Sequence, residues 1–361
     1  MFTNMIKIKN DLKRDSNFEL LRIITMLLII SHHYVVNSGL MEKINENMFS
    51  DKSLFLLIIG AWGKTGINIF LLITGYFMCQ SSISIDKFFK LIFEVIFYKV
   101  IIWIIFSLTG YESFSIMAVI ETICPVTSIS LNFTDCYLVF FLCIPFLNIL
   151  IKNMNEKQHI HLILLCFFVY IFLGTTPKIE VVMNYVTWYI VIYFIAAYIR
   201  IYSKPFFENK RLWRNIALIS ILISIASIFA GAYIGNKINK PIFYYLLSDS
   251  NKILAVTTAI SVFLYFKNLH IKKSKLINIV AASTFGVLQI HANSDAMRQW
   301  LWKDLLQTVE MYNSKWLILH VLGSVVGVYL VCTAIDYIRI RIVERPIMNL
   351  WKKYNKRDSE K

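Results

Sequence analysis

Charged residues are scarce in this chain of 361 residues, of which only 16% are Asp, Glu, Lys or Arg and 57% are hydrophobic. Soluble globular domains carry about 25% charged residues, so this shortage argues against an ordinary soluble protein. Apolar runs instead repeat along almost the whole sequence. They predict an all-α polytopic membrane protein, because a helix satisfies its own backbone polar groups inside a bilayer.

Several signatures of other protein classes are missing. The six cysteines show no paired metal-type spacing, so we expect no metal site and interpret them as small residues of the apolar runs. A disulfide between Cys124 and Cys136 is the less favoured alternative. No phosphate loop or nucleophile elbow is found. The first apolar run lacks a small-residue cleavage site, so we expect no cleaved signal peptide.

Acidic residues are outnumbered, 22 against 37 lysines and arginines, which gives a net charge of +15. Binding to nucleic acid is one explanation of such an excess. The basic residues, however, gather in every second loop, as expected when positive charge orients a membrane protein. We therefore expect no nucleic-acid partner, a location in the cell's inner membrane among its lipids, and both termini in the cytoplasm.

The apolar runs predict about ten transmembrane helices, over residues 18–37, 54–79, 88–109, 131–151, 160–173, 184–202, 213–235, 252–267, 276–292 and 316–338. Basic cytoplasmic tails, 1–17 and 339–361, flank this single domain of residues 18–338. Residues 110–130 contain no Lys or Arg, which favours an interfacial or re-entrant segment on the outer side. Residues 298–303 predict an outer interfacial helix anchored by tryptophans.

The first apolar run carries an arginine near its start and a pair of histidines near its end. Ser16 and Glu19 match a capping box, which predicts a helix start. Arg22 and His33 are eleven residues apart, which is three helical turns plus roughly 20°, or about 16 Å along the axis. Both therefore project from one face, whereas His32 points about 80° away. Such groups are costly inside a membrane unless they line a cavity or find partners.

These two side chains suit a transfer reaction better than a structural role. An imidazole such as that of His33 can remove a proton from a hydroxyl group near neutral pH. The planar guanidinium of Arg22 can bind phosphate oxygens bidentately. The alternative is a polar pair whose needs are met by neighbouring helices.

Polar groups of later segments are further candidates. Lys87 and Lys90 lie at the predicted cytoplasmic mouth, where they could bind anions or simply anchor the chain. His291 ends the run 276–292 on the outer side, where an ordinary interfacial histidine is equally possible. The remaining histidines are scattered and receive no functional assignment.

The second run is interrupted by a glycine-rich break at residues 60–66. Glycines there could bend the helix or open it, and open backbone is tolerated only beside protein or a water-filled cavity. Lys64, Asn68 and Thr74 could line that cavity. For each of them alone, a role in helix packing is the simpler interpretation.

Three motifs before residue 100 resemble one family. Residues 19–22 (Glu-Leu-Leu-Arg) are followed after ten residues by His33, residues 66–76 run from a glycine to Thr-Gly-Tyr, and Lys87 and Lys90 form a basic pair. Together they resemble the acyltransferase 3 family of bacterial membrane acyltransferases, especially members that O-acetylate cell-surface polysaccharides. It is His33, not His32, that has the family spacing.

The resemblance extends to later parts of the chain, over residues 193–200 and 283–291. It departs from the family at residues 132–137, where a tryptophan is expected and none occurs.

The resemblance implies an O-acetyltransferase that takes acetyl from cytoplasmic acetyl-CoA, a donor substrate rather than a tightly bound cofactor. The acceptor is a glycan or glycolipid at the outer face. Arg22, Lys87 and Lys90 are then expected to hold the phosphates of CoA. Its pantetheine arm runs along the helix face to His33, which acts as general base or carries the acyl group itself. His32 has a supporting role.

Other functions compete with this hypothesis. Within the same class, the enzyme could transfer another short acyl group or modify a small glycoside. From a different class, a transporter, flippase or polymerase of lipid-linked glycans also has about ten to fourteen spans. A transporter does not require the Arg22–His33 pair, and it commonly shows inverted repeats, which we do not find. The oligomeric state does not follow from the sequence.

Overall fold

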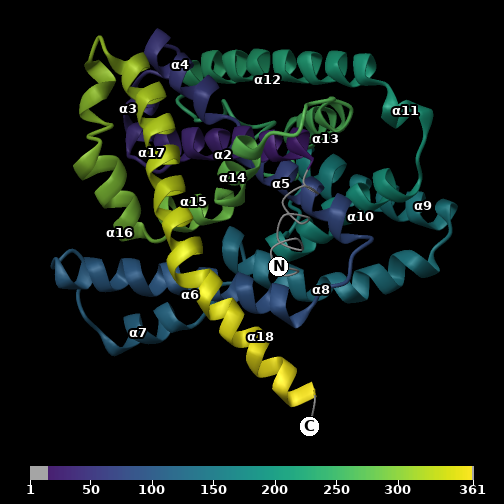
Figure 1. Ribbon diagram of the computed structural model, residues 1–361. Helices are drawn as coiled ribbons and strands as arrows, with labels where there is room; N and C mark the ends of the chain where they lie inside the picture. The colour runs from purple at the N-terminus through teal and green to yellow at the C-terminus, as the bar shows by residue number, and fades with distance from the viewer. Residues whose placement is uncertain (1–14, 360–361) are drawn as a thin grey trace.

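The computed structural model describes residues 15–359, and all regular secondary structure in this part of the chain is helical (Figure 1). The predicted all-α class is therefore confirmed for these residues. The elements up to the middle of the chain are α2 (Ser16–Val36), α3 (Leu40–Glu46), α4 (Asp51–Gly60), α5 (Gly63–Met78), α6 (Ile85–Leu108), α7 (Ile116–Ile123), α8 (Phe133–Asn153), α9 (Glu156–Cys166) with the π-helical turn Phe167–Leu173, and α10 (Tyr185–Ile201).

The second half of the chain has the same character. Its elements are α11 (Pro205–Glu208), α12 (Lys210–Ile238), α13 (Ile253–Lys267), α14 (Lys275–Ala282), α15 (Thr284–His291), α16 (Asp295–Arg298) with the π-helical turn Gln299–Leu305, the 3₁₀ turn Glu310–Asn313, α17 (Leu317–Arg339) with the π-helical turn Ile340–Glu344, and α18 (Arg345–Ser359).

A helix stands at each of the ten predicted spans, but not all are equally long. Within residues 15–359, seven helices are long and apolar enough to cross a membrane, and a pair bent by 96° (Lys275–His291 with Asp295–Asn313) makes up to eight. Helices α10 and α13 are apolar but have only 17 and 15 residues. A multi-pass membrane protein is thus supported, while the count of ten and the cytoplasmic position of the termini stay predictions.

Helix α2 occupies the interior of the bundle. It packs against α4, α5, α13, α14, α15 and α17, and Figure 1 shows α12 on one side of the molecule and α6 and α8 on the other. The outer helices expose large apolar side chains, among them Leu108, Phe146, Leu222 and Leu330. Extensive exposed apolar surface of this kind is typical of a protein surrounded by lipid.

The start of α2 differs from the predicted capping box. The N-cap is Asp15, and no side chain caps the helix. The hydroxyl of Ser16 instead donates to Oδ1 of Asn278 and accepts from the backbone N–H of Ser274. The capping-box prediction was wrong because this hydroxyl joins α2 to α14 rather than closing its own helix.

The glycine-rich break in the second span allows close packing against α2. Helix α4 ends at Gly60 and α5 begins at Gly63, yet both count as one apolar span of 28 residues. A Cβ atom on Gly63 would lie 2.3 Å from the ring of His32, and one on Gly66 would lie 2.9 Å from Ile29. Small residues at such contacts let two helix backbones approach closely. The glycines therefore bring the following residue, Lys64, next to the histidines of α2.

The last span continues beyond the expected boundary at residue 338. Residues 339–359 remain helical through the turn Ile340–Glu344 and α18, drawn in yellow in Figure 1. Arg339 is only 3% exposed, and its three nitrogens contact the carboxylates of Asp336, Glu94 and Glu344. The pair with Glu94 joins α17 to α6.

Candidate functional site

His33 on α2 and His291 on α15 form a hydrogen-bonded pair. Nδ1 of His33 lies 3.0 Å from Nε2 of His291. Nδ1 of His291 lies 2.6 Å from the carbonyl oxygen of Val287. A carbonyl can only accept, so Nδ1 of His291 is the donor there, and in a neutral ring its Nε2 is then an acceptor.

The tautomer of His33 follows from this chain of bonds. Because Nε2 of His291 accepts, Nδ1 of His33 carries the proton, and Nε2 of His33 holds a free lone pair. Within residues 15–359, no hydrogen bond involves that Nε2 atom. His33 is half-buried, whereas His291 is only 1% exposed. His291 therefore fixes the tautomer of His33, and Nε2 of His33 remains able to accept a proton.

His32 has a different environment from its neighbour. Its Nδ1 donates to the carbonyl oxygen of Gly60 at 2.6 Å, a carbonyl left free where α4 ends. Its ring also packs on Gly63. This histidine therefore joins α2 to the broken second span.

A cavity of about 650 Å³ opens beside both histidines. It gathers residues from eight helices, α2, α3, α5, α6, α8, α10, α15 and α16. Its polar and ionisable lining residues include His32, His33, Lys64, Lys99, Asn132, Thr134, Asp135, Tyr185, Gln289, Asn293 and Arg298. Apolar side chains such as Ile29, Ile67 and Phe133 line the rest of it. Donors, acceptors and charges on apolar walls are suited to a polar, hydroxyl-bearing ligand.

Lys64 occupies one wall of this cavity. Its ammonium group donates to the hydroxyl of Tyr185 and lies 3.6 Å from Oδ1 of Asp249. The Tyr185 hydroxyl in turn donates to Asp249 over 3.4 Å. Lys64 is thus held in place at the cavity by α10 and by the loop before α13.

Asp135 occupies another wall and was not singled out by the sequence. It is 1% exposed, and its Oδ2 accepts from the backbone N–H groups of Thr127 and Ser128 and from the Thr127 hydroxyl. Its Oδ1 has no hydrogen-bond partner in the described part of the chain and lies 3.9 Å from Nζ of Lys99. A buried carboxylate oxygen without a donor is costly, and Oδ1 is the oxygen of Asp135 that still lacks one.

Asn68 and Thr74 do not line this cavity. Asn68 is fully buried, donates to the carbonyl of Ser250 and accepts from Nε1 of Trp188. Thr74 donates to the carbonyl of Phe70 in its own helix. The structure therefore gives both residues contacts typical of helix packing.

The three cations expected to bind phosphate lie away from the cavity. Arg22 forms an ion pair with Glu19 at 2.9 Å, and its side chain is 26% exposed. Lys87 is exposed and donates to a backbone carbonyl, while Lys90 pairs with Glu344 at 2.7 Å. Arg22 precedes His33 by about three turns of α2, so these two residues lie toward opposite ends of that helix, while Lys87 and Lys90 lie in the first turns of α6.

Residues 15–359 contain no group of three or more His, Cys, Asp or Glu side chains placed to hold a metal ion. All six cysteines are free thiols, and a Cys124–Cys136 disulfide is not formed.

One comparison with known proteins identifies a relationship. A family model described as an acyltransferase domain, Acyl_transf_3, matches residues 15–337. The match includes the histidine pair, the polar cavity and all the spans before the C-terminal end of α17. No curated protein and no solved structure matches the chain.

Proposed function

This chain belongs to the acyltransferase 3 family and is a membrane acyltransferase. We propose that it transfers an acetyl group from acetyl-CoA to a hydroxyl of a cell-surface or lipid-linked polysaccharide. The observation that carries the proposal is the His33–His291 pair beside a polar cavity. A fixed imidazole with a free ring nitrogen is the group that acyl transfer to a hydroxyl requires.

The donor enters from the cytoplasmic end of α2 in this proposal. Arg22, Lys87 and Lys90 bind the phosphates of CoA, since guanidinium and ammonium groups form charge-assisted bonds to phosphate oxygens. Arg22 and Lys90 already pair with Glu19 and Glu344, so donor binding shares or exchanges these carboxylate partners. The pantetheine arm then extends along α2 and brings the thioester to His33.

The acceptor sugar occupies the polar cavity. Oδ1 of Asp135 accepts a hydrogen bond from one sugar hydroxyl, and Lys64 and Gln289 offer donors on other walls. The reacting hydroxyl faces Nε2 of His33. Enclosure among these groups holds the two reactants in reacting geometry, which lowers the entropic part of the barrier.

The chemical step is a direct transfer. Nε2 of His33 takes the proton of the sugar hydroxyl as its oxygen bonds to the acyl carbon, and the carbon–sulfur bond of the thioester breaks. The imidazolium returns the proton to the departing CoA thiolate, so the products are an acetyl ester and free CoA. His291 stabilises the imidazolium of His33 by accepting its Nδ1 proton in a hydrogen bond.

A second route uses His33 as the acyl carrier. Nε2 attacks the thioester, releases CoA and forms an acyl-imidazole, and the sugar hydroxyl then takes the acyl group. Rapid quenching of the enzyme with radiolabelled acetyl-CoA and no acceptor separates the routes. Label on the peptide containing His33 supports the carrier route, and its absence supports direct transfer.

The test of the proposal is an analysis of surface glycans from strains with and without the gene, by mass spectrometry and proton NMR. We expect acetyl esters at one sugar position only when the gene is present. Identical glycans in the two strains, or a difference in lipid-linked glycan export without a difference in acylation, would argue for a transporter instead.

A further inference from the structure

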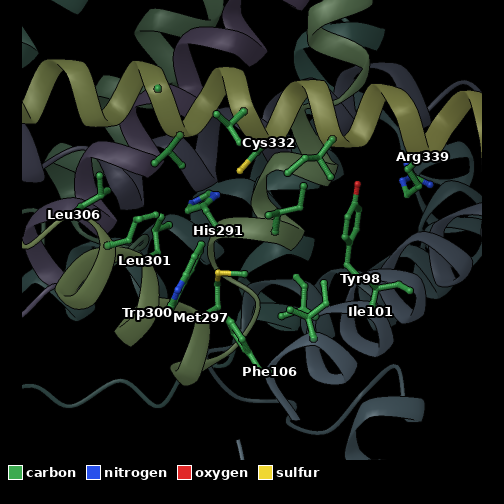
Figure 2. A pocket seen from close by; sticks show the side chains of 18 of the residues that line it. Tyr98, Ile101, Phe106, His291, Met297, Trp300, Leu301, Leu306, Cys332 and Arg339 are labelled. Atoms are coloured by element: carbon green, nitrogen blue, oxygen red, sulfur yellow. The ribbon is translucent and has the colours of Figure 1, made fainter. Parts of the chain in front are cut away.

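A second cavity, of about 1000 Å³, lies between α6 and α17 and is closed at one side by the segment of α16 and the turn Gln299–Leu305. Figure 2 shows its lining from close by. The wall is almost entirely apolar, with Ile101 and Phe106 on one side and Cys332 on the other. We call it the α6–α17 groove. Its volume is at the upper end of the range for ligand sites, about 300–1,000 Å³.

The groove is open rather than filled by its own helices. Gly323 and Gly327 line it from α17, and a Cβ atom on either would have no other heavy atom within 4 Å. The neighbouring side chain Val331 lines the groove and is 59% exposed. In a bilayer, an apolar space of this size between two helices is filled by a hydrocarbon chain. Water does not fill it, because a water molecule there would find almost no polar partner.

The groove reaches the histidine pair. His291 lines both the α6–α17 groove and the polar cavity, and its Nε2 bonds to His33. In Figure 2 the ring of His291 lies between the ends of the groove, with Leu301 and Leu306 toward one end and Tyr98 and Arg339 toward the other. A molecule with its chain in the groove can therefore place its polar end near the catalytic site proposed above.

The end of the groove at Arg339 does not offer a place for a charged headgroup. The three guanidinium nitrogens of Arg339 are engaged by Asp336, Glu94 and Glu344, and Glu344 also pairs with Lys90. A phosphate at this end would have to displace these carboxylates from Arg339. The polar end of an occupant consequently belongs at the His291 side, and its chain extends toward Arg339.

From these observations we propose that the α6–α17 groove binds the hydrocarbon chain of a lipid-linked acceptor, whose sugar then lies in the polar cavity at His33. The inference rests on the acyltransferase function proposed above and narrows its acceptor to a glycan attached to a lipid carrier. The chain stays within the membrane, and only the glycan enters the polar cavity.

The first experiment compares two forms of one acceptor pool. Lipid-linked glycans are extracted from membranes of a strain that lacks the gene, and half are released from their lipid by mild acid. We expect purified wild-type protein to acetylate the lipid-linked form with a kcat/KM at least about tenfold higher, since a few buried methylene groups suffice for that difference. Equal use of both forms would overturn the groove proposal while leaving acyl transfer intact. Transfer to neither form would overturn the proposed function and the groove proposal together.

Two variants fill the groove, and one control does not. Gly327→Leu and Val331→Trp place bulk in the open space, whereas Val326→Leu alters a side chain of the same helix that lies outside the groove and is 48% exposed. We expect the first two to lose the preference for lipid-linked acceptor and to keep their KM for acetyl-CoA, and the control to behave as wild type. Retained preference in a groove-filled variant with wild-type thermal unfolding would overturn the proposal.

Two other occupants of the groove, bulk lipid and a second copy of the chain, are tested by separate measurements. A polyprenyl phosphate with a diazirine in its chain should label peptides of α6 and α17 in phosphatidylglycerol vesicles, and lipid-linked glycan should compete with it. Equal labelling by a diazirine phosphatidylglycerol would assign the groove to bulk lipid.

Gly323 and Gly327 also match a motif for helix association. The oligomeric state of the wild type and of Gly327→Leu is therefore compared by light scattering. A change of oligomeric state in Gly327→Leu would assign the groove to a second copy of the chain.

Discussion

Nε2 of His291 lies 3.0 Å from Nδ1 of His33, although 258 residues separate the two histidines along the chain. The bond joins α2 to α15 and sets the tautomer of His33, because Val287 occupies the other nitrogen of His291. The site thus consists of one imidazole with a free nitrogen, a second that orients it, and a polar cavity beside both.

His291→Ala should lower kcat by about tenfold to a hundredfold, the usual effect of losing the partner that orients an imidazole. The KM for acetyl-CoA should not change, because His291 does not contact the proposed phosphate-binding cations. His291→Asn, which keeps a side-chain acceptor, should recover part of the rate. Steady-state kinetics in detergent measure both parameters.

His159→Ala is the matched control for that prediction. His159 is also buried and bonded to a backbone carbonyl, that of Phe194, but it lines neither of the two cavities. It should lower thermal stability and leave kcat at the wild-type value. A similar fall of kcat in both variants would mean that His291 acts only through stability.

Arg22→Ala should raise the KM for acetyl-CoA by about tenfold to a hundredfold, the effect of losing a charge-assisted hydrogen bond. The double variant Lys87→Ala with Lys90→Ala should act in the same direction. Arg214→Ala is the control, because Arg214 is an exposed cation that contacts Asn215. Donor titrations at saturating acceptor measure the effect, and an unchanged donor dependence in Arg22→Ala would refute its phosphate role.

Gly63→Ala should destabilise the protein by about 1–3 kcal/mol, the typical cost of an added group in a packed core. The new methyl group would meet the ring of His32 at 2.3 Å, so α2 and α5 must separate and the cavity beside them must change. Gly323→Ala is the control, because open space surrounds that position. Thermal unfolding should show a lower midpoint only in Gly63→Ala, and equal midpoints would refute the close contact.

Arg339→Leu should destabilise the protein by about 3–5 kcal/mol, because it leaves the buried carboxylates of Asp336 and Glu94 without the arginine that pairs with them. Arg341→Leu removes a neighbouring exposed arginine and should have little effect. Chemical or thermal unfolding in detergent distinguishes them. Equal stability of both variants would show that the ion pairs of Arg339 contribute nothing.

The helices were predictable from the sequence because each depends on a local apolar run. Every predicted span coincides with a helix, and the segment 298–303, predicted as an interfacial helix, is helical from the end of α16 into the turn Gln299–Leu305. Boundaries were less predictable. The last span was predicted to end near residue 338, but it runs on to Trp351. Arg339 finds its carboxylate partners inside the bundle, and no local pattern reveals a partner supplied by another helix.

The site was predictable only in part. The spacing of Arg22 and His33 follows from the geometry of a single helix, so the sequence could place both on one face. The partner of each polar residue depends on how helices pack. Asn68 was a candidate for the cavity wall, yet packing turns it to Trp188 and Ser250. Asp135 lies in the one segment where the family pattern is not matched, and its burial becomes visible only in three dimensions.

The central claim is that His33 performs the acyl transfer, and one measurement tests it most directly. A strain lacking the gene is complemented with wild type, His33→Ala or His32→Ala at matched membrane levels, and acetyl esters on its surface glycans are counted by proton NMR. The loss of a general base typically costs about 10²–10⁴ in rate, so we predict no detectable ester with His33→Ala. We expect substantial ester with His32→Ala. Wild-type acetylation by His33→Ala would contradict the account.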